Sequence, residues 1–228
     1  METAGSGRVA LGRGRILAAA LEIIDRDGLE ALTMRTLADA LGVAPMATYR
    51  HYANKGELLD ALLNAVAYGL LVPESHGDWR STALALARSV RENLLQHPGL
   101  VSAVISRPSL GPSAVRLAEA MYGPLRAAGF DDRTTERATS LLFGYVLGFV
   151  GLEAPRRAAA AATDPEVHVS QADLESAYGG VDPAVIPHTL EIAPAPGEFI
   201  SDAQFEWGLA VILDGIAGQP VTSREGRR

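Results

Sequence analysis

The chain contains no cysteine and a single lysine, Lys55, and only 6% of its 228 residues are aromatic. Because cysteine is missing, disulfide bonds, thiolate nucleophiles and cysteine-ligated zinc sites are excluded. No window approaches the roughly 18 consecutive apolar residues that a membrane-spanning helix requires. The N-terminal segment also lacks the apolar core of a secretory signal. We therefore expect a cytoplasmic protein that has no membrane partner and holds no metal or other cofactor.

Strand-like alternation of apolar and polar residues is also missing from the sequence. Apolar residues instead recur at helical spacing, and Thr33, Asn54 and Ser201 are of the residue types that begin helices. These patterns predict an all-α fold, with helices over residues 16–27, 34–41, 45–52, 55–71, 79–96, 99–106, 112–128, 132–153 and 201–217.

Turn-rich and proline-rich segments divide this helical chain. We expect a flexible N-terminal arm over residues 1–15, a helix-turn-helix domain over 16–56 with a linking helix over 55–71, and a second helical domain over 72–228. Residues 155–200 contain six prolines. This region predicts a long mobile loop, with one short helix near residues 171–178.

The net charge of −7 argues at first against a nucleic-acid partner. Its distribution is uneven, because residues 1–56 carry a net charge of +1 and residues 57–228 carry −8. Arg8, Arg13 and Arg15 cluster ahead of the first helix, where they either form an arm that reaches DNA or serve only to solubilise the chain. A weakly basic head on an acidic body is compatible with local DNA contact.

Residues 34–52 have the spacing of a helix-turn-helix. Ala38 is small where two helices must approach, and Gly42, four residues later, accepts the left-handed backbone of a sharp turn. Pro45 suits the first turn of the following helix. In this motif the second helix enters the DNA major groove, although helix pairs with a turn glycine also occur in other bundles.

A longer stretch, RILAAALEIIDRDGLEALTMRTLADALGVAPMATYRHYANKGELLDALL, contains G-L-x-x-L-T-x-R-x-L-A, L-G-V, T-Y-R-H-Y and N-K-x-E-L-L. Along its full length it resembles the DNA-binding domain of the tetracycline-repressor (TetR) family of bacterial transcriptional regulators. GDWRSTALALARSVRENLLQHPGL, LLFGYVLGFV and FEWGLAVILDGI are similar to the ligand-binding and dimerisation domain of the tetracycline-repressor subgroup. The resemblance implies a homodimeric repressor that binds a palindromic DNA operator and is released by a small-molecule effector.

The resemblance also implies a set of DNA-contacting residues on and around the second helix of the motif. Residues 45–47 would read base edges, Tyr49 and Lys55 would contact phosphate, and helical phase turns Arg50 toward the groove. Met46 and Ala47 are apolar and suit thymine methyl groups. The full set is Thr33, Arg35, Pro45, Met46, Ala47, Tyr49, Arg50, His51 and Lys55. Thr48 departs from the family, which usually has a larger aliphatic residue at that position.

The two longest apolar helices, 132–153 and 201–217, are the expected dimer interface. The first is apolar on every side, so one side must face its own domain and the other a second copy. Glycines on one side permit close approach, and two protomers would form a four-helix bundle. The predicted interface residues are Gly144, Gly148, Gly151, Trp207 and Val211.

The effector site is expected within the helices between residues 79 and 153, beneath the loop 155–200. Candidate ligand contacts are His97, Met121, Tyr122, Phe143 and Tyr145, each of which has packing in the core as its alternative role. Leu71 stands where tetracycline repressors have a drug-binding histidine. We therefore expect an apolar or aromatic effector instead of a metal-chelated tetracycline.

An enzyme is the main alternative class, and the sequence offers no catalytic constellation for it. Asp164, Glu166 and His168 alternate in a way that suits a metal, but no second cluster accompanies them. Phosphate-binding loops, nucleophile elbows and dinucleotide fingerprints are absent. A helical protein-binding module and a transcriptional activator of the same fold stay open as alternatives, because the sequence reveals the DNA-reading element and not the promoter.

Overall fold

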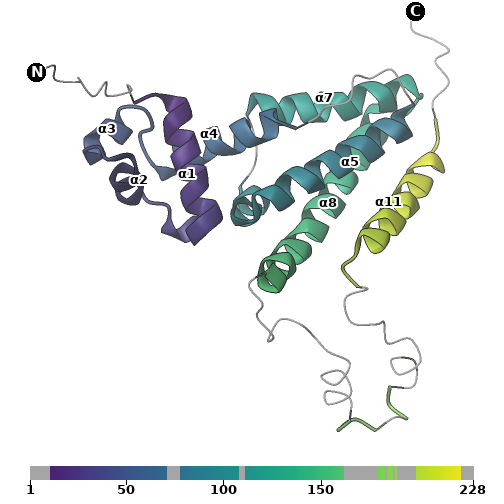
Figure 1. The fold of residues 1–228 in the computed structure, drawn as a ribbon. Coiled ribbons are helices and arrows are strands. Elements are labelled where there is room, and N and C mark those ends of the chain that lie inside the picture. The colour runs from purple at the N-terminus through teal and green to yellow at the C-terminus, as the bar shows by residue number, and fades with distance from the viewer. Residues whose placement is uncertain are drawn as a thin grey trace, which may run out of the picture. The chain divides into compact units, whose positions relative to one another are not determined.

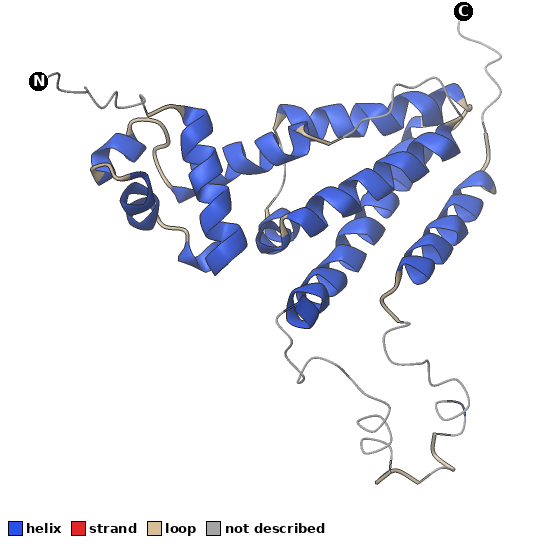
Figure 2. Ribbon diagram, viewed as in Figure 1, coloured by secondary structure: helices blue, strands red, loops and turns tan. Residues whose placement is uncertain are grey.

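The computed structural model describes residues 11–70, 78–107, 111–161, 179–182, 184–186, 188 and 199–221. Every regular element in these ranges is a helix (Figure 2), which confirms the predicted all-α fold. Two short 3₁₀ helices are written η1 and η2. The elements are α1 (Arg13–Asp27), η1 (Leu29–Ala31), α2 (Met34–Leu41), α3 (Pro45–Tyr49), α4 (Lys55–Tyr68), α5 (Trp79–Gln96), η2 (Pro98–Leu100), α6 (Val101–Ser106), α7 (Pro112–Ala127), α8 (Asp132–Ala161) and α11 (Asp202–Ala217).

The first of two compact units combines the chain up to Leu70 with Gly99–Leu117. Helix α1 packs against α2 and α4 (Figure 1), and α2 packs against α3. Apolar side chains recur on the inward face of each helix, so burying them together forms one core. Its fully buried members are Ile16, Ile24, Leu32, Leu37, Leu58, Leu62 and Leu100.

Residues 99–117 join this unit although they follow α5 in sequence. A Cβ atom at Gly99 would overlap the backbone carbonyl oxygen of Ile24, so only glycine permits this approach. Farther along, a guanidinium nitrogen of Arg107 donates to Asp60 Oδ1 at 2.8 Å. These residues fall within the predicted second domain of 72–228, whereas their contacts lie with the helix-turn-helix unit.

The second unit contains α5, the second half of α7, α8 and α11. Helix α8 packs against α5 on one side and α11 on another (Figure 1). The rings of Tyr145, Phe149 and Phe205 lie with their centroids 5.2 to 5.9 Å apart and join α8 to α11. A Cβ atom at Gly208 would overlap the ring of Tyr145, so this glycine lets α11 approach α8.

The predicted helix starts at Thr33, Asn54 and Ser201 are confirmed. Each side-chain oxygen accepts a hydrogen bond from the backbone N–H three residues later, at 3.0, 2.9 and 3.1 Å respectively. Each bond satisfies one of the amide groups that a helix N-terminus leaves unpaired. These caps fix where α2, α4 and α11 begin.

Four predicted helix boundaries are wrong by three residues or more. Helices α3 and α4 end at Tyr49 and Tyr68 instead of at residues 52 and 71. Helix α1 begins at Arg13, so the last three residues of the expected arm over residues 1–15 are helical. Helix α8 continues through Pro155 to Ala161, beyond the predicted end at residue 153. Proline removes one helical hydrogen bond, but the helix on both sides of it is held by ion pairs of Glu153 and Arg157.

Helix α8 is also long and apolar enough, by length and composition, to cross a membrane. Buried helices of globular proteins pass the same test. Its packing against two neighbouring helices and its ion-paired Glu153 are features of a core helix.

Candidate DNA-binding interface and effector pockets

The turn between α2 and α3 is formed by Gly42. Its φ of 66° lies in the left-handed region, which glycine adopts without steric cost. The N–H groups of Gly42 and Val43 donate back to the carbonyl oxygens of Asp39 and Ala38 at 3.1 and 3.0 Å. This pairing of the last carbonyl groups of α2 ends the helix and redirects the chain into α3.

Thr48 is fully buried at the back of α3. Its hydroxyl group donates to the carbonyl oxygen of Pro45 at 2.7 Å, so the buried polar group is satisfied inside its own helix. A threonine therefore fits where a larger aliphatic side chain was expected, and the opposite face of α3 is left outermost.

Six of the nine predicted DNA-contacting residues are exposed to solvent. The exposed members are Thr33, Arg35, Pro45, Met46, Tyr49 and Arg50, whereas Ala47, His51 and Lys55 are half-buried. Met46 and Tyr49 are 67% and 44% exposed, so α3 presents one large apolar and one aromatic side chain to solvent. The fold thus brings all nine residues to α2, α3 and the start of α4.

Lys55 has a structural partner that the sequence did not reveal. Its ammonium nitrogen donates to the carbonyl oxygen of Leu29 at 3.0 Å and so ties the start of α4 to η1. An ammonium group has three donors, so this bond leaves capacity for a second acceptor. Lys55 therefore helps to hold the unit together, and its contact with phosphate stays a prediction.

Arg13 belongs to the folded unit and not to an arm. Its guanidinium group lies 5.6 Å from the ring centroid of the buried Tyr52, within the range of a cation–π contact. Burial raises the pKa of the Tyr52 hydroxyl, which stays neutral at physiological pH. Arg8, which was also expected in the arm, lies outside the described residues.

An uncovered apolar strip runs along α8 and α11 in the second unit. On α8 it contains the exposed Gly144 and Gly148, and an added Cβ at either position would meet nothing within 4 Å. Trp207 and Val211 form the corresponding exposed face of α11. Gly151 is half-buried at the edge. Sequence reasoning missed Leu141 and Leu152, two exposed leucines in helical phase with the α8 glycines.

The predicted ligand-contact residues do not all lie in one site. Met121 and Phe143 meet in an apolar cavity, whose other lining residues are Ala83, Leu86, Ala87, Val90, Leu142 and Val146. The volume of this cavity is about 10 Å³, roughly that of one water molecule. His97 at the end of α5 and Tyr122 on α7 do not line it.

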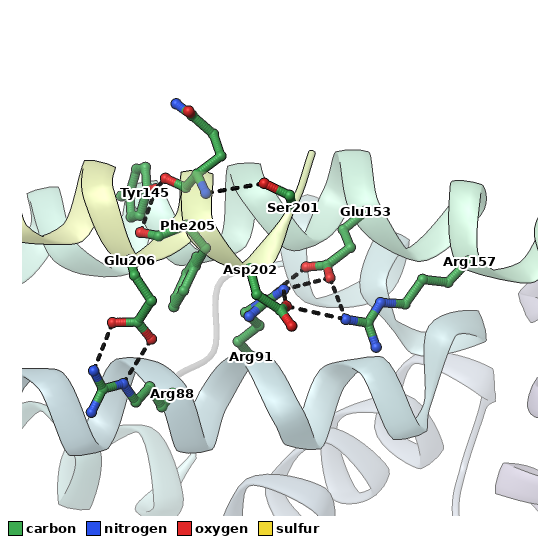
Figure 3. A network of polar contacts seen from close by, with 10 residues as sticks. Arg88, Arg91, Tyr145, Glu153, Arg157, Ser201, Asp202, Phe205 and Glu206 are labelled. Atoms are coloured by element: carbon green, nitrogen blue, oxygen red, sulfur yellow. Dashed lines mark hydrogen bonds and ion pairs between the residues drawn. The ribbon is translucent and has the colours of Figure 1, made fainter. Parts of the chain in front are cut away.

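Tyr145 does not line this cavity either. Its hydroxyl group donates to the carbonyl oxygen of Phe205 at 2.9 Å (Figure 3), and burial raises the pKa of that hydroxyl. Tyr145 thus takes part in the packing of α8 against α11, and its role as a ligand contact stays a prediction.

A larger pocket of about 560 Å³ lies among α5, α8 and α11, and its lining is charged. Arg91 donates to both carboxylate oxygens of Glu153 at 2.8 and 2.6 Å and also binds Asp202 (Figure 3). These hydrogen bonds lower the pKa of Asp202. The guanidinium of Arg88 holds Glu206 in the same bidentate way and lowers the pKa of that carboxyl. No local sequence pattern indicates this network, because its members are up to 118 residues apart.

Residues 16–62 match the family described as "Bacterial regulatory proteins, tetR family", and residues 72–219 match "Tetracyclin repressor-like, C-terminal domain". This chain belongs to the TetR family of bacterial regulatory proteins. The predicted family membership is thereby confirmed. Members of this family are soluble DNA-binding transcriptional regulators and not enzymes, in agreement with the rejection of an enzyme.

This TetR-family chain is similar to several characterised proteins. It is 37% identical over 144 residues to an HTH-type transcriptional regulator of Saccharopolyspora erythraea, which covers 63% of this chain but only 61% of that relative. It is 33% identical to the class A tetracycline repressor of Escherichia coli, covering 93% and 94% of the two chains. Among solved structures, ActR of Streptomyces coelicolor bound to actinorhodin has a TM-score of 0.75 at 31% identity and covers 92% of this chain and 100% of its own.

Leu71 and the Asp164, Glu166 and His168 cluster of this TetR-family regulator lie outside the described residues, as does the short helix expected at 171–178. Within the described ranges, no group of three His, Cys, Asp or Glu side chains is placed to hold a metal ion.

Proposed function

We propose that this TetR-family regulator is a cytoplasmic, ligand-responsive repressor that binds a palindromic operator as a homodimer. A small apolar or aromatic effector releases it. The observation that supports this most directly is the outer face of α3, where Met46, Tyr49 and Arg50 are exposed beside a turn that presents the helix outward. A helix of this kind fits the major groove of B-DNA.

Each exposed side chain of α3 has a distinct use in such docking. The tyrosine hydroxyl of Tyr49 suits a phosphate oxygen, which positions the helix without reading sequence. The guanidinium of Arg50 suits a bidentate contact to guanine, and Met46 suits a thymine methyl group. The helix therefore offers both positioning and sequence-reading contacts within one and a half turns.

Dimerisation is supported by the apolar strip on α8 and α11. Soluble monomers rarely expose several large apolar side chains in one patch, and here Trp207 and Val211 lie on one helix face while Gly144 and Gly148 lie on another. Glycines let a second helix approach closely. Pairing two copies through these faces would bury the strip and set two α3 helices against the two halves of a palindrome.

The apolar cavity at Met121 and Phe143 is the proposed effector site. Its lining is entirely apolar, but its volume of about 10 Å³ is far below the roughly 300 Å³ of the smallest usual ligand pockets. An effector must therefore stabilise a more open arrangement of α5, α7 and α8. A ligand that favours this arrangement lowers operator affinity through coupling of about 1–3 kcal/mol. The complex of the similar ActR with actinorhodin supports a regulator that responds to a bound ligand.

The test is selection of bound genomic DNA fragments, followed by affinity measurements on the operator found. Tyr49→Ala should weaken binding to every DNA sequence by about 1 kcal/mol and flatten its salt dependence. Met46→Gln should instead change the preferred base at one position of each half-site, by about 1–3 kcal/mol. Tyr68→Ala is the matched control, because Tyr68 is an exposed tyrosine at the far end of α4. If no fragment is enriched, or if all three variants bind alike, the proposed function is refuted.

A further inference from the structure

The charged pocket among α5, α8 and α11 has the size of a small-molecule site. Its volume of about 560 Å³ falls within the usual range of roughly 300–1,000 Å³, unlike that of the apolar cavity. Its lining also lies off the apolar strip, because Glu153 and Glu206 point toward α5 while their neighbours Leu152 and Trp207 are exposed. The lining residues are Arg88, Arg91, Glu92, Leu95, Gln96, Arg157, Asp202 and Glu206.

Each arginine side chain of this pocket is already paired with a protein carboxylate. Arg88 directs two donors to Glu206, at 2.8 and 2.6 Å. Arg91 directs its donors to Glu153 and Asp202, and Arg157 contacts the same two carboxylates (Figure 3). An anionic ligand would have to displace these bidentate partners and leave protein carboxylates unpaired, which costs free energy.

The carboxylates are in excess over the arginines. Three arginines face Glu92, Asp202 and Glu206, and Glu153 lies directly beneath them, so the site carries a net charge of −1. Asp202 and Glu206 are exposed enough to accept further hydrogen bonds. Glu92 is exposed on α5, and its carboxylate makes no hydrogen bond or ion pair within the described part of the chain.

We propose that this pocket binds a small organic cation whose positively charged nitrogen group pairs with Glu92. The carboxylates of Asp202 and Glu206 provide further acceptors, and Leu95 with the aliphatic stems of the arginines contacts the apolar body of the ligand. A positively charged group gains most where a nearby carboxylate has no competing partner. The site goes beyond the proposed function, because its ligand is of opposite character to the effector of the apolar cavity.

The test compares two fluorescent probes that share a xanthene core but differ in charge, cationic rhodamine 123 and anionic fluorescein. Fluorescence anisotropy with the full chain should give at least tenfold tighter binding of rhodamine 123. Glu92→Gln removes the charge while keeping the shape of the side chain, and it should weaken rhodamine 123 binding at least fivefold. Glu119→Gln removes an equally exposed carboxylate from α7, outside the pocket, and should change the affinity less than twofold.

Several results would overturn the proposed cation site. Equal or tighter binding of fluorescein, absence of rhodamine 123 binding up to millimolar concentration, or unchanged binding in Glu92→Gln would each overturn the inference. Equal losses in Glu92→Gln and Glu119→Gln would also overturn it, since they would reflect only the overall negative charge. Operator affinity of the same preparations, measured without a probe, reports on the proposed function independently.

Discussion

Two ion pairs that join α5 to its neighbours have nearly the same geometry but different burial, which makes them a matched pair for an experiment. Arg91–Glu153 and Arg88–Glu206 are both bidentate, with one contact at 2.8 Å and one at 2.6 Å. The side chains of Arg91 and Glu153 are 11% and 4% exposed, whereas those of Arg88 and Glu206 are 56% and 40% exposed. The two pairs therefore differ mainly in burial, and the buried pair also has second partners in Arg157 and Asp202.

The expected costs follow from what each substitution leaves behind. Removing one partner of a buried pair costs about 3–5 kcal/mol, because the remaining charge stays away from water. After Glu153→Leu, Arg91 keeps Asp202 as an acceptor and its contact 4.5 Å from the ring centroid of Phe205. We therefore expect the lower end, about 3 kcal/mol. Glu206→Leu leaves Arg88 in water and should cost less than about 1 kcal/mol.

The assay is urea unfolding followed by circular dichroism at pH 7 and one fixed protein concentration, since assembly would make stability depend on concentration. A double-mutant cycle with Arg91→Leu and Glu153→Leu isolates the pair. The double variant replaces both charges with apolar groups, so its cost should fall short of the sum of the single costs by about 2–3 kcal/mol. Equal costs for Glu153→Leu and Glu206→Leu, or additive single costs within the cycle, would refute the reasoning from burial.

Three further predictions use other features of the fold. Gly42→Ala should lower the free energy of unfolding by about 1–2 kcal/mol, because the φ of 66° at this position strains any residue with a Cβ. Gly123→Ala is the control: this glycine lies inside α7 with open space around it, so the substitution should be neutral or stabilising in the same urea titration. The pKa values of Asp202 and Glu206 are lowered in the folded state, so the stability that these carboxylates contribute is complete above the unfolded-state pKa near 4 and is lost as the pH falls through their folded-state pKa values. The decrease in the free energy of unfolding between pH 7 and pH 3 should therefore be smaller in Asp202→Asn than in the unaltered protein, by less than about 1 kcal/mol. Gly148→Leu should shift sedimentation from dimer to monomer by placing a bulky group on the apolar strip, while Gly123→Leu should not; a Gly148→Leu dimer of unchanged affinity would move the interface elsewhere.

Local signals made much of the first unit predictable. Thr33, Asn54 and Pro45 mark helix starts through bonds and backbone angles confined to three or four residues, and Gly42 marks a turn in the same way. Such effects are encoded in a short stretch of sequence, so the start of each of these helices was found. The faces of α2 and α3 followed from helical phase.

Long-range contacts explain what the sequence could not provide. The approach of Gly99 to Ile24 assigns residues 99–117 to the first unit, and no local pattern distinguishes that glycine from one in a turn. Pro155 read as the end of a helix, but Glu153 and Arg157 hold α8 together through partners on α5 and α11. The charged pocket was missed for the same reason, since its lining comes from three separate helices.

Helix α8 shows why an apolar sequence can hide several functions. Val146 turns toward the apolar cavity, Phe149 packs with α11, and Leu152 lies in the uncovered strip, so successive residues three apart serve three different neighbours. Because α8 contacts different neighbours on each side, it is apolar all round, and helical periodicity alone does not show which face contacts which neighbour. Only the small residues distinguish one face of α8 from the others. Gly144 and Gly148 add no side chain to a core, so their recurrence on one side is explained by a neighbour that must come close. Leu141 and Leu152 extend that same side by a turn at each end, which makes the proposed contact between protomers about three helical turns long.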